Sequence, residues 1–441
     1  MQETSVDLVR KNDKKTIHSW AMYDWANSAY ALVIVSAIFP PYYNTITEVE
    51  GVTKIKVLGV NIENTAAYSI TLGIAFGIIA LISPLLSSIA DYNSNHRSFM
   101  KFFCYLGSFG CMILFFFDQP QLVHLALAGL MLATVGYCGS IVFYNSYLPA
   151  IATEDRQDKV SARGYAYGYI GATTLLIFNL MFIMNEESLG VEDHTLFPRL
   201  SFLLTGLWWL GFAQIPLRRL PRGLYVPKPK GNHVLNGYME LLKVWDQLKS
   251  IKKLRLYLFS FFFYIMGVQT VMFMAASFGE KEIHMGIKEL IITVLLLEYL
   301  GIAGAFLFAW ISKKTSNLTA LILAVSIWIC ICTGSYFIRT PLHFYIAAFF
   351  IGMVMGGIQS LSRSTYAKMI PETRNNAGYF SFYDVCEKTA MMFGLIMFGT
   401  LDHLTGSMRN SIIALGLWFT IGLALLLIVC RLKTQIQPGA K

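Results

Sequence analysis

Four ionisable side chains lie inside long apolar segments of this sequence, where they can carry chemistry that exposed charges do not. Glu298 follows a run of three leucines. Asp384, Glu387 and Lys388 lie close together within another apolar segment. An ionised group at the centre of a membrane-spanning helix costs about 2.5–3.5 kcal/mol on insertion scales, so such residues usually face a cavity and act there. These residues therefore indicate ion coupling or charge pairing inside a membrane.

Glu298 is predicted to bind and release the coupling ion. Burial disfavours the ionised form of a carboxyl group, so a carboxyl at this position can exchange a proton near neutral pH. The alternative is a neutral side chain that makes one hydrogen bond between helices. Sodium is the other candidate ion, because residue types alone do not separate the two.

The second group, Asp384, Glu387 and Lys388, is also predicted to take part in ion coupling. Helical spacing places Asp384 on one face with both Glu387 and Lys388. Two negative charges and one positive charge then share a site, so one carboxylate is harder to ionise. The group is interpreted either as an ion-pair switch or as a static pair that fixes the register of the helices.

The composition requires lipid as the solvent for most of the chain. The 441 residues are 55% hydrophobic and 14% charged, whereas a soluble domain has about 25% charged residues. The formal charge of +9 is spread between the apolar blocks, so no basic patch for nucleic acid is expected. The first apolar block is longer than the core of a signal peptide and is expected to remain as a span.

The predicted fold is an all-α membrane protein with twelve transmembrane helices in two pseudo-symmetric six-helix bundles. A helix needs about 20 apolar residues to cross a bilayer, and the sequence offers twelve such segments. They lie near 20–43, 66–90, 99–117, 121–148, 162–184, 197–217, 254–278, 286–312, 317–337, 341–369, 376–401 and 408–431.

The distribution of basic residues orients these spans. Most of the 35 lysine and arginine residues fall on the side that holds the N-terminus, so the positive-inside rule places both termini in the cytoplasm. The expected organisation is a cytoplasmic tail (1–19), an N-terminal bundle (20–217), a basic cytoplasmic loop (218–253), a C-terminal bundle (254–431) and a second tail (432–441).

The central loop is predicted to contain a basic amphipathic helix on the anionic inner leaflet. The stretch 227–230 alternates proline and lysine and cannot be helical. The residues after it recur at helical spacing among lysines, a pattern typical of helices that lie in the membrane interface. They are Leu235, Tyr238, Leu242, Trp245, Leu248 and Ile251. A binding site for a regulatory partner is the alternative.

Three motifs resemble those of a known family. The segment 20–30 reads Trp-Ala-Met-Tyr-Asp-Trp-Ala-Asn-Ser-Ala-Tyr and resembles the signature of the vacuole-effluxer-like branch of the major facilitator superfamily. The stretches 144–171 and 359–388 agree with it. This resemblance implies transport of a small solute by alternating access, with amino acids as the expected class.

The resemblance also implies gating residues. The wider superfamily carries the loop motif G-x-L-A-D-R-x-G-R after its second span. Here Ala90, Asp91 and the later Arg97 survive, with Ser87 in the place of the glycine. Asp91 and Arg97 are therefore the gating candidates, although the departure from the motif puts their locking role in doubt.

In proteins that this sequence resembles, the first, fourth, seventh and tenth spans line the cavity. Arg363 would suit a substrate carboxylate, because its planar guanidinium binds one bidentately. It could equally lie at the cytoplasmic end of its span, and Asp24 could likewise be interfacial. The predicted substrate-binding residues are Asp24, Asn27, Tyr30, Asn145, Tyr147, Gln269, Gln359 and Arg363.

Other classes of protein find little support. The eight histidines lie in loops or at span ends, the seven cysteines lack metal-ligand spacing, and no phosphate-binding loop occurs. We expect no enzyme activity, no cofactor and no metal. The expected partners are a small-molecule substrate, a proton or sodium ion and the lipid bilayer of a bacterial inner membrane, with the chain acting as a monomer. Alternatives are an exporter of drugs or other metabolites, or a non-transporting lipid scramblase or sensor.

Overall fold

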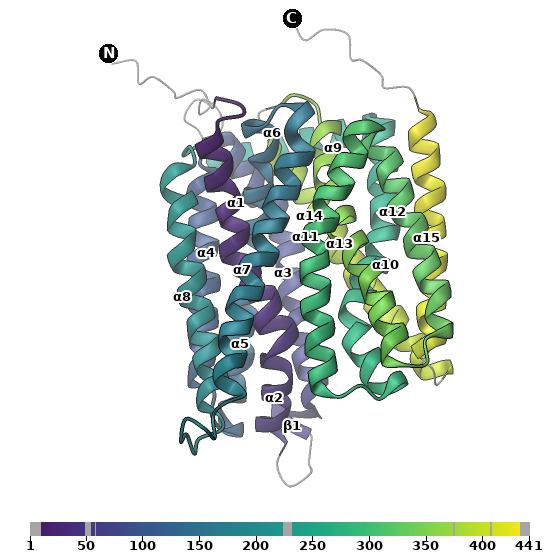
Figure 1. The fold of residues 1–441 in the computed structure, drawn as a ribbon. Coiled ribbons are helices and arrows are strands. Elements are labelled where there is room, and N and C mark those ends of the chain that lie inside the picture. Colours follow the sequence, from purple (N-terminus) through teal and green to yellow (C-terminus); the bar gives the residue numbers. More distant parts are fainter. Residues whose placement is uncertain are drawn as a thin grey trace, which may run out of the picture. The chain divides into compact units, whose positions relative to one another are not determined.

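The computed structural model describes residues 10–48, 54–57, 59–223, 232–373, 375–405 and 408–432. The prolines predicted to interrupt the central loop, the first residues of the N-terminal tail and most of the C-terminal tail lie outside these ranges. Helices account for nearly all of the described chain (Figure 1).

The long helices follow the predicted order of spans. Their bounds are α1 Lys14–Ala29, α2 Phe39–Thr47, α3 Asn64–Asn93, α4 His96–Ile113, α5 Val123–Ser146, α6 Leu148–Ile151, α7 Gln157–Ile183, α8 Leu196–Arg219, α9 His233–Ser250, α10 Lys252–Ile283, α11 Ile287–Lys314, α12 Asn317–Gly334, α13 Pro341–Met369, α14 Asn376–Thr405 and α15 Met408–Arg431. A π-helix, η1 (Tyr30–Ala37), joins α1 to α2, and short 3-10 turns are η2 (Leu114–Phe116), η3 (Pro120–Leu122), η4 (Glu154–Arg156) and η5 (Ser335–Phe337).

The all-helical membrane fold is confirmed. In the described ranges, 10 helices are long and apolar enough to cross a membrane, or 11 if the bent pair at the N-terminus is one span. The remaining predicted span coincides with α14, which is 30 residues long and contains Asp384, Glu387 and Lys388. The bend of 41° lies between η1 and α2. The first turn of α2 contains two consecutive prolines, which lack the amide hydrogens that would continue the preceding helix.

One element was not predicted. Strands β1 (Lys54–Val57) and β2 (Val60–Glu63) form an antiparallel hairpin between α2 and α3, with Ile55 paired to Ile62. The hairpin lies in the loop after the first span. Its valines and isoleucines favour extended backbone, and Gly59 supplies the positive φ of 88° at the turn.

The chain divides into two compact units. The first contains residues 1–153, 163–240 and 374–385, and the second contains 154–162, 241–373 and 386–441. The units resemble the two predicted bundles except for two short segments, since the start of α7 groups with the second unit and the start of α14 with the first. The predicted domain boundaries stay a prediction.

Packing within each unit relies on close helix contacts. In the first unit α4 packs against α5 and α8, and in the second α11 packs against α13. A Cβ atom at Gly356 would collide with the carbonyl oxygen of Gly301. Only glycine allows this approach of α11 and α13, which is the role that small residues have between membrane helices.

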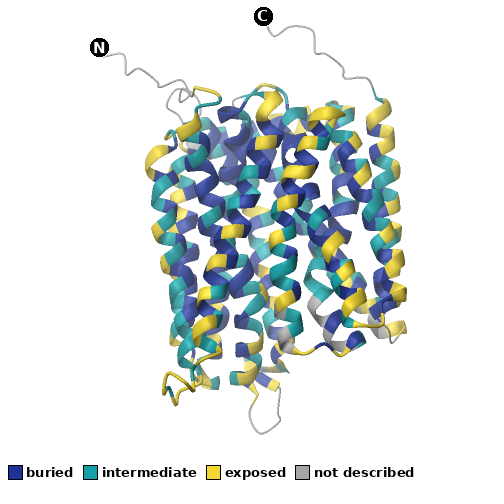
Figure 2. Cartoon of the chain, in the orientation of Figure 1, coloured by how far each residue is buried: buried dark blue, intermediate teal, exposed yellow. Residues whose placement is uncertain are grey.

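Large apolar side chains also cover the outside of the helices. Along α15, buried and exposed residues alternate with the helical turn (Figure 2). Leu415 and Phe419 are buried, whereas Leu417 and Leu427 are 59% and 44% exposed. Such a surface is unfavourable in water and is suited to lipid acyl chains.

Candidate functional site

Asp24 is held inside the first unit by an aromatic residue of α5. Its carboxylate accepts a hydrogen bond of 2.6 Å from the Tyr144 hydroxyl, and the side chain is buried. Trp20 stacks on the Tyr144 ring with centroids 4.4 Å apart and donates its indole hydrogen to the Tyr144 carbonyl at 2.9 Å. The acceptor therefore has a fixed position between α1 and α5.

Asn27 lies one turn further along α1 and retains hydrogen-bonding capacity. It is 1% exposed, and neither its amide nitrogen nor its amide oxygen has a hydrogen-bond partner among the described residues. Buried polar groups without partners are rare in folded proteins. The amide of Asn27 is therefore free to bind a ligand or water.

Other predicted substrate residues of the first unit are engaged with the protein. The Tyr30 hydroxyl lies 2.7 Å from that of Thr134. Tyr147 donates its hydroxyl hydrogen to the Pro221 carbonyl at 2.8 Å. Asn145, the residue after Tyr144, is also buried.

A charged cluster lies inside the second unit. The Gln269 amide on α10 donates to the Glu387 carboxylate at 3.0 Å. The other oxygen of Glu387 lies 3.5 Å from the Lys388 ammonium. The Lys388 side chain is 8% exposed and that of Glu387 is 20% exposed. We call these three residues the α10–α14 charge cluster; Asp384, one turn earlier on α14, is also buried.

The α10–α14 charge cluster contains Gln269 in place of Asp384, which the sequence groups with Glu387 and Lys388. Gln269 was assigned to the substrate, and its bond to Glu387 was not predicted, because the two residues lie on different helices. Helical periodicity relates Asp384, Glu387 and Lys388 to one another, but it carries no information on which helix packs beside them.

Glu298 on α11 has no polar partner in the described chain. Among the described residues it has no hydrogen-bond or ion-pair partner, and the side chain is half-buried. Ala305 and Ala309 continue the same face of α11 and pack against Ala162 of α7. An ion that binds this carboxyl group would therefore displace no protein partner among the described residues.

Arg363 is bound to the first turns of α7. Its guanidinium donates to the Ser161 hydroxyl at 2.9 Å and to the Ser161 carbonyl at 2.8 Å. The side chain is 2% exposed, so it is buried rather than solvated at the end of its span. Gln359 lies one turn earlier on α13 and is half-buried.

Asp91 forms a latch with the start of α14. One carboxylate oxygen accepts from the Gly378 amide at 2.7 Å, and the other accepts from the Ala377 amide at 3.2 Å. The His96 imidazole lies 2.6 Å from the carboxylate, and both side chains are fully buried. A carboxylate is favoured at a helix N-terminus, where free amide hydrogens and the helix dipole attract negative charge.

Arg97 has a different set of partners from Asp91. Its guanidinium donates to the carbonyls of Leu220 at 2.8 Å and Arg218 at 3.3 Å. These carbonyls are at the end of α8, which lacks later amide hydrogens to bind them. Arg97 thus stabilises the end of α8.

A second latch was not predicted from the sequence. Asp158, in the first turn of α7, accepts from the Lys368 ammonium at 2.8 Å, from the Ser312 hydroxyl at 2.8 Å and from the Asn317 amide at 2.6 Å. It ties α7 to the ends of α11, α12 and α13. Lys368 and Asp158 lie 210 residues apart in the chain, so spacing along the sequence does not pair them.

Helix α9 exposes large apolar side chains along one face, whereas Val244 and Leu248 are buried. Leu235, Tyr238 and Trp245 are 56%, 51% and 43% exposed. On the opposite face, Gly237 contacts Ile89 of α3. That protein-facing side also bonds through polar groups: Asn236 donates to Tyr92 at 2.9 Å, and Glu240 accepts from Asn375 at 3.1 Å.

No group of three or more His, Cys, Asp or Glu side chains in the described residues could hold a metal ion.

The arrangement of the helices is shared with solved transporters. The chain resembles the structure of FucP, a major facilitator superfamily transporter, in the outward conformation, with a TM-score of 0.67 and 12% identity over 94% of this chain and 98% of that one. It resembles the proton:xylose symporter XylE with a TM-score of 0.70 and 13% identity over 94% and 95% of the two chains. The fold is that of a major facilitator superfamily transporter.

Residues 12–437 match the family model described as "Vacuole effluxer Atg22 like", and the chain belongs to this family. It is 31% identical over 421 residues to the uncharacterized MFS-type transporter YxiO of Bacillus subtilis, covering 95% of this chain and 96% of the relative. It is 23% identical over 518 residues to autophagy-related protein 22 of Coccidioides immitis, covering 91% and 84%. The family predicted from the first motif is confirmed.

Proposed function

We propose that this chain is a proton-coupled exporter of amino acids, which works by alternating access in the plasma membrane of a bacterium. Glu298 is the observation that carries the proposal. A carboxyl group within a membrane helix, without a hydrogen-bond or ion-pair partner in the described chain, is costly unless it serves an ion. The direction follows the family description, which names an effluxer.

The proposed substrate class matches the groups that each unit offers. An amino acid carries one ammonium and one carboxylate. In the first unit, Asp24 supplies a carboxylate and Asn27 an unpartnered amide. In the second, the α10–α14 charge cluster supplies groups of both signs. Tyr30, Asn145, Tyr147, Gln359 and Arg363 stay predictions as substrate residues.

The two latches supply the proposed gate. Under the orientation set by the basic residues, both lie at the cytoplasmic ends of their helices. Opening toward the cytoplasm would require the start of α14 to leave Asp91 and the start of α7 to leave Lys368. Asp91 remains the gating candidate of the sequence motif, whereas Arg97 would support the gate indirectly by holding the end of α8.

We expect Glu298→Gln to uncouple transport from the pH gradient. Glutamine retains the shape of the side chain but cannot release a proton. In proteoliposomes, accumulation of substrate driven by a pH gradient should fall at least about tenfold, whereas exchange of substrate for substrate should change less than about twofold, because exchange needs no net proton movement. The readout is uptake of radiolabelled substrate in both modes.

Glu289→Gln is the matched control, since Glu289 is a carboxylate at the start of the same helix. It accepts a hydrogen bond from the Gly286 amide at 2.9 Å. The substitution should leave both modes unchanged. If Glu298→Gln keeps the pH dependence of the native protein, Glu298 is not the coupling residue.

The substrate class is tested by transport currents from the purified protein in liposomes, perfused in turn with the proteinogenic amino acids at two pH values. A saturable, pH-dependent current for some of them is expected. If folded protein gives no current with any amino acid, amino acids are not the substrate class, and drugs or other metabolites are favoured. Movement of labelled phospholipid without solute flux would identify a scramblase.

Tyr144→Phe should weaken substrate binding. The change removes the hydroxyl that positions the Asp24 carboxylate, and a hydrogen bond to a charged group contributes about 1.5–3 kcal/mol. The concentration of substrate at half-maximal rate should rise about tenfold, with the maximal rate changed less than about twofold. Tyr299→Phe is the control, because Tyr299 is 55% exposed on the outside of α11. An unchanged half-maximal concentration in Tyr144→Phe would remove Asp24 from the substrate site.

A further inference from the structure

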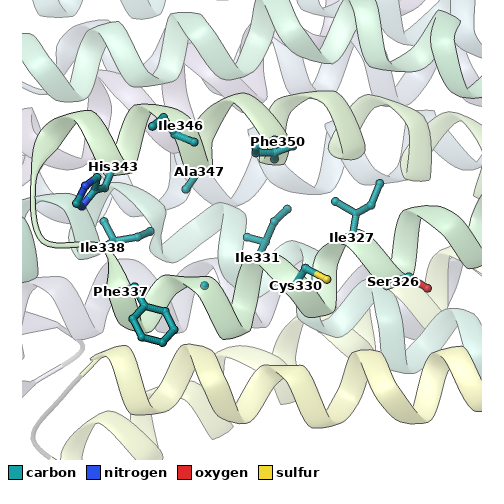
Figure 3. Close-up of a pocket in the computed structure, with 11 residues that line it drawn as sticks. Ser326, Ile327, Cys330, Ile331, Phe337, Ile338, His343, Ile346, Ala347 and Phe350 are labelled. Atoms are coloured by element: carbon teal, nitrogen blue, oxygen red, sulfur yellow. The ribbon is translucent and has the colours of Figure 1, made fainter.

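A groove of about 570 Å³ lies between α12 and α13 in the second unit (Figure 3). Its walls are apolar, with Ile327 and Ile331 from α12 and Ala347 and Phe350 from α13. Ser326 also lines it, but its hydroxyl donates to the Ile322 carbonyl of its own helix at 2.8 Å. The body of the groove therefore accepts an apolar guest and offers it no polar group.

The groove is nearly as long as one lipid leaflet is thick. From Ser326 to Gly334 it follows α12 for about 12 Å at the rise of an α-helix, and the apolar half of a bilayer is about 15 Å thick. Its end is the turn η5, which the distribution of basic residues places on the outer side. Phe337 and Ile346 at its rim are 71% and 51% exposed. The groove thus opens sideways to lipid.

Positive and polar groups gather at the outer end. The His343 ring lines this end, beside Ile338 (Figure 3). Among the described residues its imidazole has no hydrogen-bond partner. Arg339 follows Ile338, is exposed, and has its guanidinium 5.8 Å from the centre of the Tyr336 ring.

The same turn is held in place from behind. Arg409 of α15 is buried and donates to the Ile338 carbonyl and to Glu282, the latter at 2.8 Å. Because Glu282 is neutralised by Arg409, it does not cancel the charge of Arg339. The outer end is therefore a turn that presents the exposed guanidinium of Arg339 and the imidazole of His343.

We propose that this groove binds one phospholipid of the outer leaflet, with an acyl chain between α12 and α13 and the lipid phosphate held by Arg339 and His343. The acyl chain matches the length and polarity of the groove. The phosphate matches the guanidinium, which forms strong charge-assisted hydrogen bonds to phosphate oxygens. The site is separate from the ion-coupling and substrate residues, so it does not depend on the proposed transport activity.

The test is native mass spectrometry of the full-length, delipidated protein titrated with phosphatidylglycerol, phosphatidylcholine and diacylglycerol of the same acyl chains. We expect one saturable site for the two phospholipids and binding of diacylglycerol at least about tenfold weaker. Ala347→Trp, which fills the groove, should weaken binding of both phospholipids at least about tenfold. Arg339→Ala, a change at an exposed position, should do so by about tenfold.

Leu417→Trp on α15 is the matched control, since it adds the same side chain to an exposed lipid-facing position outside the groove. It should change binding less than about twofold. The proposal is overturned if Ala347→Trp binds lipid as the native protein does, if Leu417→Trp loses as much binding, or if diacylglycerol or Arg339→Ala shows no loss of affinity.

Discussion

Lys388→Met is expected to reduce the rate of transport at least about a hundredfold and to lower the thermal midpoint of the protein in detergent. The substitution leaves the Glu387 carboxylate inside the second unit without the ammonium 3.5 Å away. Breaking a buried ion pair from one side costs about 3–5 kcal/mol, because a buried charge then lacks compensation. Both transport and thermal unfolding of the purified variant can be measured.

The double variant Glu387→Gln with Lys388→Met separates stability from function. Removing both charges should restore part of the lost thermal midpoint, since Glu387 no longer carries an uncompensated charge, while transport stays low if the charges act in the cycle. Restored transport in the double variant would show that the pair only fixes the packing of α14. Lys388→Arg keeps the charge and should retain part of the activity.

Asp91→Asn is expected to release the start of α14. Asparagine can still accept one hydrogen bond, but it lacks the negative charge that the helix N-terminus and His96 favour. Charge-assisted hydrogen bonds are about twice as strong as neutral ones, so the amides of Ala377 and Gly378 should exchange their hydrogens at least about tenfold faster. Hydrogen–deuterium exchange of the peptide over 376–385, followed by mass spectrometry, measures this directly.

Asp118→Asn serves as the control for this experiment. Asp118 pairs with Arg199 at 3.0 Å within the first unit. Loss of this ion pair should leave hydrogen exchange in α14 unchanged. Native-like exchange over 376–385 in Asp91→Asn would mean that the latch contributes little to holding α14.

The sequence predicts the membrane fold well because composition and length suffice for that purpose. A run of about 20 apolar residues has few alternatives to a membrane helix, and basic residues orient the runs. Even α14, which carries Asp384, Glu387 and Lys388, follows its predicted limits closely. The β-hairpin after α2 was missed because short extramembrane segments carry weak signals.

The candidate site was predicted less completely, and the reason is geometric. Residue type shows that Glu387 and Asp158 need partners, but the partners Gln269 and Lys368 lie 118 and 210 residues away in the chain. Spacing arguments relate residues on one helix only. His96 is an exception, because it lies only five residues after Asp91. A carboxylate and an imidazole on either side of a short turn between helices could have been predicted to pair.

Half of the Asp91 latch is built from backbone. Ala377 and Gly378 contribute their amide hydrogens and no side-chain atom, so the contact with Asp91 does not depend on the identity of their side chains. Proline alone lacks the required hydrogen. The hydrogen bonds to Asp91 therefore place no demand on the side chains at these two buried positions, and a search for correlated substitutions would not detect that these residues touch. The contact is preserved by the shape of a helix end rather than by a pair of matched residues.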